Sequence, residues 1–150
     1  KLLHSPDFYM SGYLEAKRDE YIEHLLAVSR DGDWTGWCEF FLQGVKEQAA
    51  ENERKARAVL QLYEKTKEQV VALAHSEHAI HAVDTMFKIP TFTSKTFVRQ
   101  SGIPKPTAKR ILRLLRDNGI LRALQKGKGR RPGIYAFREL LNVAEGKKIL

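Results

Sequence analysis

The stretch from Trp34 to Ala74 contains no proline and only two glycines, Gly36 and Gly44. Asp33 precedes it, and aspartate is a preferred residue for capping a helix N-terminus. We therefore predict one continuous helix. At 1.5 Å per residue, a helix of this length would extend about 60 Å, which is longer than a 17.2 kDa globule is wide. Part of it must project from the fold or pack on another chain.

Shorter helices are predicted around the long one. Ser5-Pro6-Asp7 combines a hydroxyl cap, a proline suited to the first turn and an acid near the positive end of the helix dipole. Further helices are indicated by apolar residues at helical spacing and by the glycine or proline that ends each run. These helices cover residues 17–29, 76–88 and 138–145.

Residues 93–137 contain two short helices, a turn and a hairpin. Thr93 and Ser94 are caps for a first helix that ends at Gly102, and Pro106 suits the first turn of a second helix. Residues 120–125 and 133–137 form a hairpin with a basic tip, and we expect no other β structure. The second helix has a buried stripe at positions i, i+3, i+4 and i+7, formed by Ala108, Ile111, Leu112 and Leu115. The whole pattern resembles the winged helix-turn-helix domains.

The charge of the chain is unevenly distributed. Residues 1–87 hold 10 Lys+Arg and 15 Asp+Glu, a net charge of −5, whereas residues 88–138 hold 14 and 1, a net charge of +13. A solvated surface is the simpler explanation, but a block with one acid among fourteen bases repels itself. A phosphate backbone is the natural partner for such a block, so we expect this region to bind double-stranded DNA.

The resemblance to winged helices places two sets of candidate DNA-binding residues. Cations on the second helix recur at i, i+4 and i+8 on the side away from the apolar stripe, where they would enter a groove, and arginine there can pair bidentately with guanine. Cations of the Gly-rich wing suit the phosphate backbone. The groove set is Lys105, Thr107, Lys109, Arg110 and Arg113, with Arg110 and Arg113 expected to contact bases; the backbone set is Lys126, Lys128, Arg130 and Arg131.

A second resemblance covers residues 2–60. The runs Tyr9-Met10-Ser11-Gly12-Tyr13 and Gly32-Asp33-Trp34-x-x-Trp37-x-x-Phe40-Phe41-Leu42 resemble the closing part of the Fic (Fic/DOC) family. Many members append a winged helix to a helical Fic domain. The resemblance implies a mostly α chain: the end of a Fic-type domain, with the long helix, over residues 1–74, then a winged helix with a small β-hairpin over residues 75–150. It also implies that the complete protein transfers AMP from ATP, with a divalent metal, to a hydroxyl of a target protein.

The family's catalytic signature is His-Pro-Phe, two variable residues and Gly-Asn-Gly-Arg, in which the histidine is the base and the Gly-rich turn holds phosphates. No such run occurs in this sequence. In the family it precedes the part that matches Lys1 onward, so we expect the chain to be a fragment that starts after it. We assign no catalytic residue, no metal ligand and no cofactor to the chain itself. Two functions stay open: a DNA-binding regulator of transcription, and a docking or oligomerisation module that presents targets to the catalytic domain.

Two weaker patterns have simpler explanations. His75, His78 and His81, with Glu77 and Asp84 nearby, have a spacing that a metal site on one helix would need, but surface histidines are the favoured interpretation. The aromatic residues at helical spacing are more often core than a ligand site, so we expect them to be buried. They are Tyr9, Tyr13, Trp34, Trp37, Phe40 and Phe41.

The remaining expectations concern compartment and assembly. The sequence has a single cysteine, Cys38, and neither an apolar run of membrane-spanning length nor a signal-peptide pattern, so we expect a cytoplasmic protein. Apolar residues in the second half of the long helix would lack partners in their own chain and would favour a homodimer. They are Val59, Leu60, Tyr63 and Val70.

Overall fold

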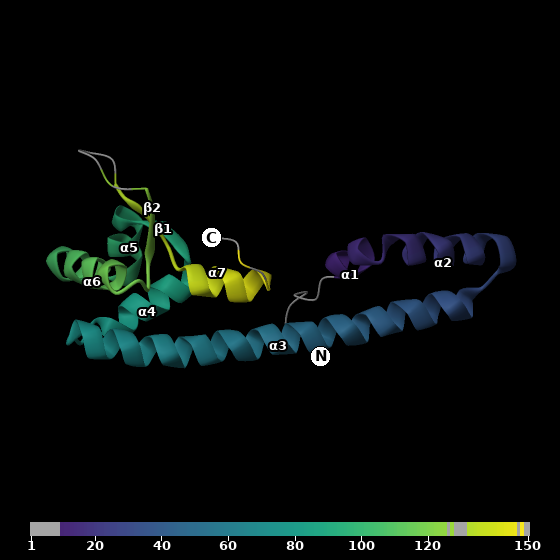
Figure 1. Ribbon diagram of the computed structural model, residues 1–150, viewed down its shortest axis with the longest axis horizontal. Helices are drawn as coiled ribbons and strands as arrows, with labels where there is room; N and C mark the ends of the chain where they lie inside the picture. The colour runs from purple at the N-terminus through teal and green to yellow at the C-terminus, as the bar shows by residue number, and fades with distance from the viewer. Residues whose placement is uncertain (1–9, 126, 128–131, 147, 149–150) are drawn as a thin grey trace. The chain divides into compact units, whose positions relative to one another are not determined.

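The computed structural model describes residues 10–125, 127, 132–146 and 148 (Figure 1). This part of the chain is mostly helical with one small antiparallel sheet, which confirms the predicted fold class. The elements are α1 (Ser11–Ala16), α2 (Arg18–Asp31), α3 (Trp34–Ala74), α4 (Ala79–Lys88), β1 (Thr91–Thr93), α5 (Ser94–Ser101), α6 (Lys105–Asp117), β2 (Arg122–Gln125), β3 (Ile134–Ala136) and α7 (Arg138–Glu145).

The chain divides into two compact units, Lys1–Arg54 and Lys55–Leu150. The division falls inside α3, whereas the predicted domain boundary lies at its end, between Ala74 and His75. The long helix itself is confirmed, and it contributes residues to both units. No helix in the described ranges is long and apolar enough to cross a membrane.

The first unit is built from α1, α2 and the beginning of α3. The ring of Tyr13 in α1 packs against Phe40 in α3, with 5.7 Å between ring centroids, and both side chains are buried. A Cβ atom at Gly44 would lie 2.5 Å from the Tyr13 ring, so this glycine permits the close approach of α1 to α3. Asp33 caps α3 as predicted, because its Oδ1 accepts a hydrogen bond from the Gly36 N–H at 2.9 Å.

Two sequence-based expectations fail or remain open in this unit. The predicted aromatic core is only partly correct, because the side chain of Trp34 is 65% exposed and that of Phe41 is 38% exposed. The physical reason is that α1 and α2 cover only one side of α3. The helix start predicted at Ser5 and the position of Tyr9 lie outside the described residues, and α1 begins at Ser11.

The second unit has a continuous core to which the second half of α3 belongs. Val70 is fully buried there, Leu62 and Ala74 are nearly so, and Val59 and Tyr63 pack against the same cluster. The expectation that Val59, Tyr63 and Val70 lack partners is therefore wrong, because α4 to α7 and the sheet fold back onto this half of the helix. Of the residues expected to seek another chain, Leu60 is exposed, at 66%.

The sheet of the second unit has the strand order β1-β3-β2, with both pairs antiparallel. The hairpin strands β2 and β3 confirm the prediction within two residues. The expectation that residues 120–137 contain all the β structure is wrong, because Thr91, Phe92 and Thr93 pair with Ala136, Tyr135 and Ile134. This strand has only three residues, too few for a visible alternation. It forms because β3 offers a free edge and because Phe92 is buried in the core.

The order α4, β1, α5, α6, β2, β3 is that of a winged helix, and α7 follows it. Thr93 caps α5 as predicted, since its hydroxyl accepts from the Thr96 N–H at 3.1 Å. The predicted stripe of α6 is confirmed, because Ala108, Ile111, Leu112 and Leu115 are all buried. Helix α4 starts at Ala79 and not at residue 76, because His75 has a φ of 43° and interrupts the helix.

Candidate nucleic-acid interface

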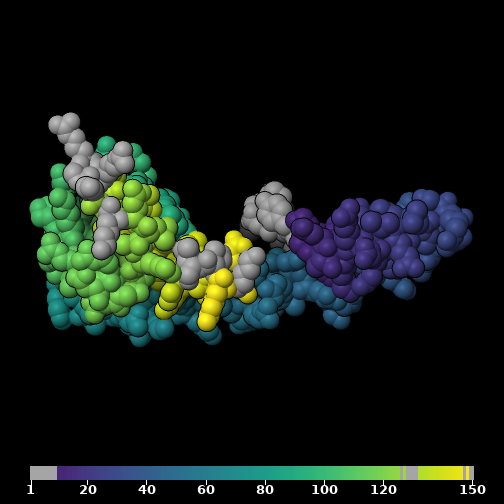
Figure 2. All heavy atoms as spheres, turned by 45° about the horizontal axis from the view of Figure 1, so that its top comes forward, coloured from purple at the N-terminus to yellow at the C-terminus, as the bar shows by residue number. Residues whose placement is uncertain are grey.

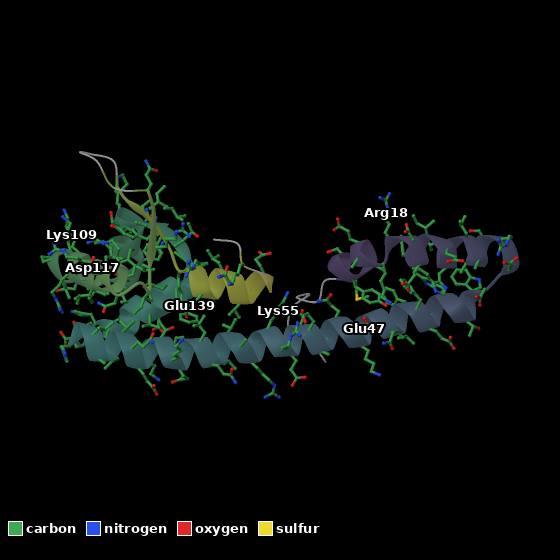
Figure 3. The ribbon with its side chains drawn as sticks, viewed as in Figure 1. Arg18, Glu47, Lys55, Lys109, Asp117 and Glu139 are labelled. Atoms are coloured by element: carbon green, nitrogen blue, oxygen red, sulfur yellow. The ribbon has the colours of Figure 1, made fainter. Side chains whose placement is uncertain are left out.

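Helix α6 carries a core-facing side and a cationic side. Its buried stripe fixes the helix in the second unit, and this leaves Lys105, Lys109 and Arg113 exposed. In the part of the chain that the structure describes, these three side chains make no ion pair. Lys109 projects outward from α6 in Figure 3, and the green atoms of α6 form an open face of the second unit in Figure 2. The polar candidate Thr107 lies half-buried at the edge of this face.

The last turn of α6 is electrostatically different. Arg116 donates two hydrogen bonds to Asp117 Oδ1, from Nε at 2.9 Å and from Nη2 at 2.7 Å. This carboxylate raises the pKa of the Arg116 guanidinium above its ordinary value. Asp117 is the one acid between residues 88 and 138. Of the five cations of α6, only Arg116 therefore has a partner of opposite charge among the described residues.

Arg110 does not share the environment of the other groove candidates. Its Nη2 donates a hydrogen bond to the backbone carbonyl of Ala74 at 2.9 Å. The predicted groove set is therefore split in the structure: Lys105, Lys109 and Arg113 lie together without partners, whereas Arg110 is engaged by the end of α3. The helical spacing of α6 could not reveal this contact, because the acceptor belongs to a residue 36 positions away.

The backbone-contacting candidates Lys126, Lys128, Arg130 and Arg131 lie outside the described residues. The strands that lead to them are described, and their pairing is irregular between Ala123 and Gln125. Other exposed cations of the second unit were not among the predicted contacts, and they include Lys95 and Arg99 on α5 and Arg122 on β2. The one sequence signal that included them was the overall basic block.

The three histidines considered for a metal site do not share a helix. His75 and His78 precede α4, and His81 lies within it. The rings of His78 and His81 are 6.1 Å apart, and Asp84 accepts a hydrogen bond from the Tyr63 hydroxyl at 2.7 Å. Nowhere in the described ranges do three or more His, Cys, Asp or Glu side chains gather as a metal site would require. The geometry therefore offers no support for the metal hypothesis.

The first unit exposes a set of large apolar side chains, which we call the apolar patch residues. They are Ile22, Leu25 and Leu26 of α2 and Trp34, Phe41 and Leu42 of α3, between 38% and 65% exposed. A groove of about 400 Å³ runs along α2, where Ile22 and Leu26 lie among Asp19, Glu23 and Arg30. Ile22 and Leu26 line this groove together, and exposed apolar side chains that adjoin in this way are typical of surfaces that contact another protein.

No model of a known protein family matches the sequence. The resemblance to the Fic family therefore depends on the motifs of the first 60 residues alone. For the second unit, the functional argument depends on the winged-helix topology and on the charge of α6.

Proposed function

We propose that this chain is a DNA-binding, regulatory region of a Fic-type protein, and that it acts in transcription by reading duplex DNA through α6. The observation that carries this proposal is the exposed side of α6, where Lys105, Lys109 and Arg113 have no ion-pair partner among the described residues. The core holds the opposite side of this helix, so the cations are presented from a fixed support. Phosphate oxygens and guanine edges are the ligands that such a row of cations fits best.

The strength of the interaction should depend steeply on salt. Each phosphate that a cation neutralises contributes about −0.9 to the slope of log K against log salt concentration. Three contacts from α6 would thus give a slope of roughly −3, and contacts from the wing cations Lys126, Lys128, Arg130 and Arg131 would add to it.

A titration of fluorescent duplexes of varied sequence, at several salt concentrations, tests the proposal. Arg113→Ala should weaken binding by roughly 1 to 3 kcal/mol at particular base pairs if the guanidinium reads a base, or lower the slope by about one if it contacts a phosphate. Lys67→Ala is a matched control, because it removes a cation of the same unit that already pairs with Glu64 at 3.2 Å on α3. Absence of binding to any duplex at low salt, or equal losses in both variants, would overturn the proposal.

The apolar patch favours a second function, a docking or oligomerisation module that presents target proteins to a Fic catalytic domain. Trp34 and Leu42, each 65% exposed, are the side chains most available for such contacts. Association through apolar surface changes little with salt, in contrast to binding of DNA. Light scattering of the wild type and of Leu42→Ser, at low and high salt, tests it. A wild-type monomer at micromolar concentration that captures no Fic catalytic domain would refute it.

We assign no catalysis to this chain. In the Fic family, ATP and the divalent metal are held by the catalytic signature, and the residues of this sequence do not provide it. Positioning of the phosphates and stabilisation of their charge are most of the catalysis in such a transfer. Incubation with labelled ATP and candidate target proteins should label none above background. Labelling that a substitution in this chain abolishes would show that a site has been overlooked.

A further inference from the structure

Arg110 connects the DNA-facing helix to the end of the long helix. Its guanidinium Nη2 donates to the carbonyl oxygen of Ala74 at 2.9 Å. Ala74 is the last residue of α3, and it is buried, with 2% of its surface exposed. Arg110 itself is exposed on α6, so its side chain reaches from the outer side of that helix to the end of α3.

The carbonyl that Arg110 contacts is one that α3 cannot satisfy by itself. The last four carbonyls of an α-helix lack partners within the helix. The N–H of His75 makes the last helical bond, to the Val71 carbonyl at 3.3 Å, and the left-handed φ of 43° at His75 then ends the helix. The Ala74 carbonyl therefore points beyond the last turn, where a cation is also favoured by the helix dipole.

We propose that Arg110 is a positioning residue for α6 and not a reader of bases. The buried stripe holds α6 against the core, and the bond from Arg110, which starts on the exposed side of α6, ties the helix to a second point at the end of α3. Two attachments that start from different sides of α6 limit the rotation of the helix about its own axis. This rotation determines where Lys109 and Arg113 point. The effect on DNA depends on the proposed function, whereas the attachment to α3 does not.

Hydrogen exchange of the full chain without DNA tests the attachment. Arg110→Ala should speed exchange of the amides in residues 71–79 by roughly three- to tenfold, because a charge-assisted hydrogen bond at the helix end is lost. Arg113→Ala is the matched control, since it removes an arginine from the same helix without touching Ala74, and exchange there should stay at the wild-type rate. Arg110→Lys keeps a donor and should restore part of the protection.

Binding of duplex DNA supplies the second readout. Arg110→Ala should weaken binding to all sequences by a similar factor, because Lys109 and Arg113 are then less well oriented, whereas Arg110 itself contacts no base. Unchanged exchange over residues 71–79 in Arg110→Ala, or a loss of binding confined to particular base pairs, would overturn the inference. If no variant and no wild type binds DNA, the proposed function fails, while the exchange result still decides whether Arg110 holds the end of α3.

Discussion

Phe40→Ala should unfold the first unit and leave the second unit folded. Phe40 is 7% exposed and is the central side chain of the packing between α1, α2 and α3. Its ring centroid lies 5.7 Å from that of Tyr13, 4.9 Å from that of His24 and 6.1 Å from that of Trp37. Truncation to alanine removes all three ring contacts at once.

The cost of this truncation exceeds what the first unit can tolerate. Replacing a packed phenylalanine by alanine costs about 3–5 kcal/mol, while complete domains have a free energy of unfolding of only about 5–15 kcal/mol. Within the described residues of the first unit, Tyr13 and Phe40 are the buried hydrophobic side chains. Such a small core places the free energy of unfolding of the first unit at or below the lower end of that range, so the first unit of the variant should be unfolded.

Tryptophan fluorescence provides the assay, because both tryptophans of the chain, Trp34 and Trp37, belong to the first unit. Phe40→Ala should shift the emission to longer wavelength, mainly through Trp37, which is only partly exposed. The helical circular dichroism of the second unit should still melt cooperatively. Phe97→Ala is the reciprocal control: Phe97 is fully buried in the second unit, so its loss should abolish that melt with little change in emission. A single transition shared by both probes in the wild type, or loss of both units in either variant, would refute independent folding.

Two further substitutions test single contacts of the second unit. In the wild type, the hydrogen bond from Tyr63 to Asp84 raises the pKa of the Tyr63 hydroxyl above 10.0. Tyr63→Phe removes this bond, and the bond should stabilise the fold by about 0.5 kcal/mol. Because the pKa of the Tyr63 hydroxyl is higher in the folded than in the unfolded chain, this stabilisation is complete below pH 10 and is lost as the pH rises through the folded-state pKa. Urea melts should show this fall in stability at high pH for the wild type and not for Tyr63→Phe. Asp117→Asn removes the one acid among residues 88–138 and releases Arg116. It should tighten binding of duplex DNA severalfold at low salt, and unchanged or weaker binding would place the last turn of α6 away from the phosphates.

The elements that the sequence predicts well are those whose signals are local. The stripe of α6 follows from the spacing of Ala108, Ile111, Leu112 and Leu115, and the bounds of α7 follow from its apolar residues and from Gly146 after it. Caps such as Asp33 and Thr93 are equally local, because the acceptor and the donor lie three residues apart. These features need no knowledge of the rest of the fold.

The features that the sequence does not predict depend on partners far along the chain. Strand β1 exists because β3, more than forty residues later, has a free edge. Val70 and Tyr63 are covered because the second unit folds back on α3, and periodicity alone cannot distinguish this from packing on another chain. The same holds for Arg110 in the candidate site, whose acceptor is the carbonyl at the end of a helix that precedes it by 36 residues.

The two proposed functions depend on different units and on different physical interactions, so one salt series can separate them. The first unit carries the apolar patch, and contacts through Trp34 and Leu42 should persist at high salt. The second unit carries Lys105, Lys109 and Arg113, whose attraction for phosphate falls as counterions accumulate. At physiological ionic strength the Debye length is about 8 Å, so acidic side chains farther than this from α6 have little influence on its contacts. The slope of log K against log salt concentration would therefore count the phosphates bound by the second unit, whatever the net charge of the first unit. A complex that loses DNA at high salt but keeps its protein partner would show that both functions occur in one chain. Arg113→Ala should then weaken binding of DNA and leave binding of the protein partner unchanged.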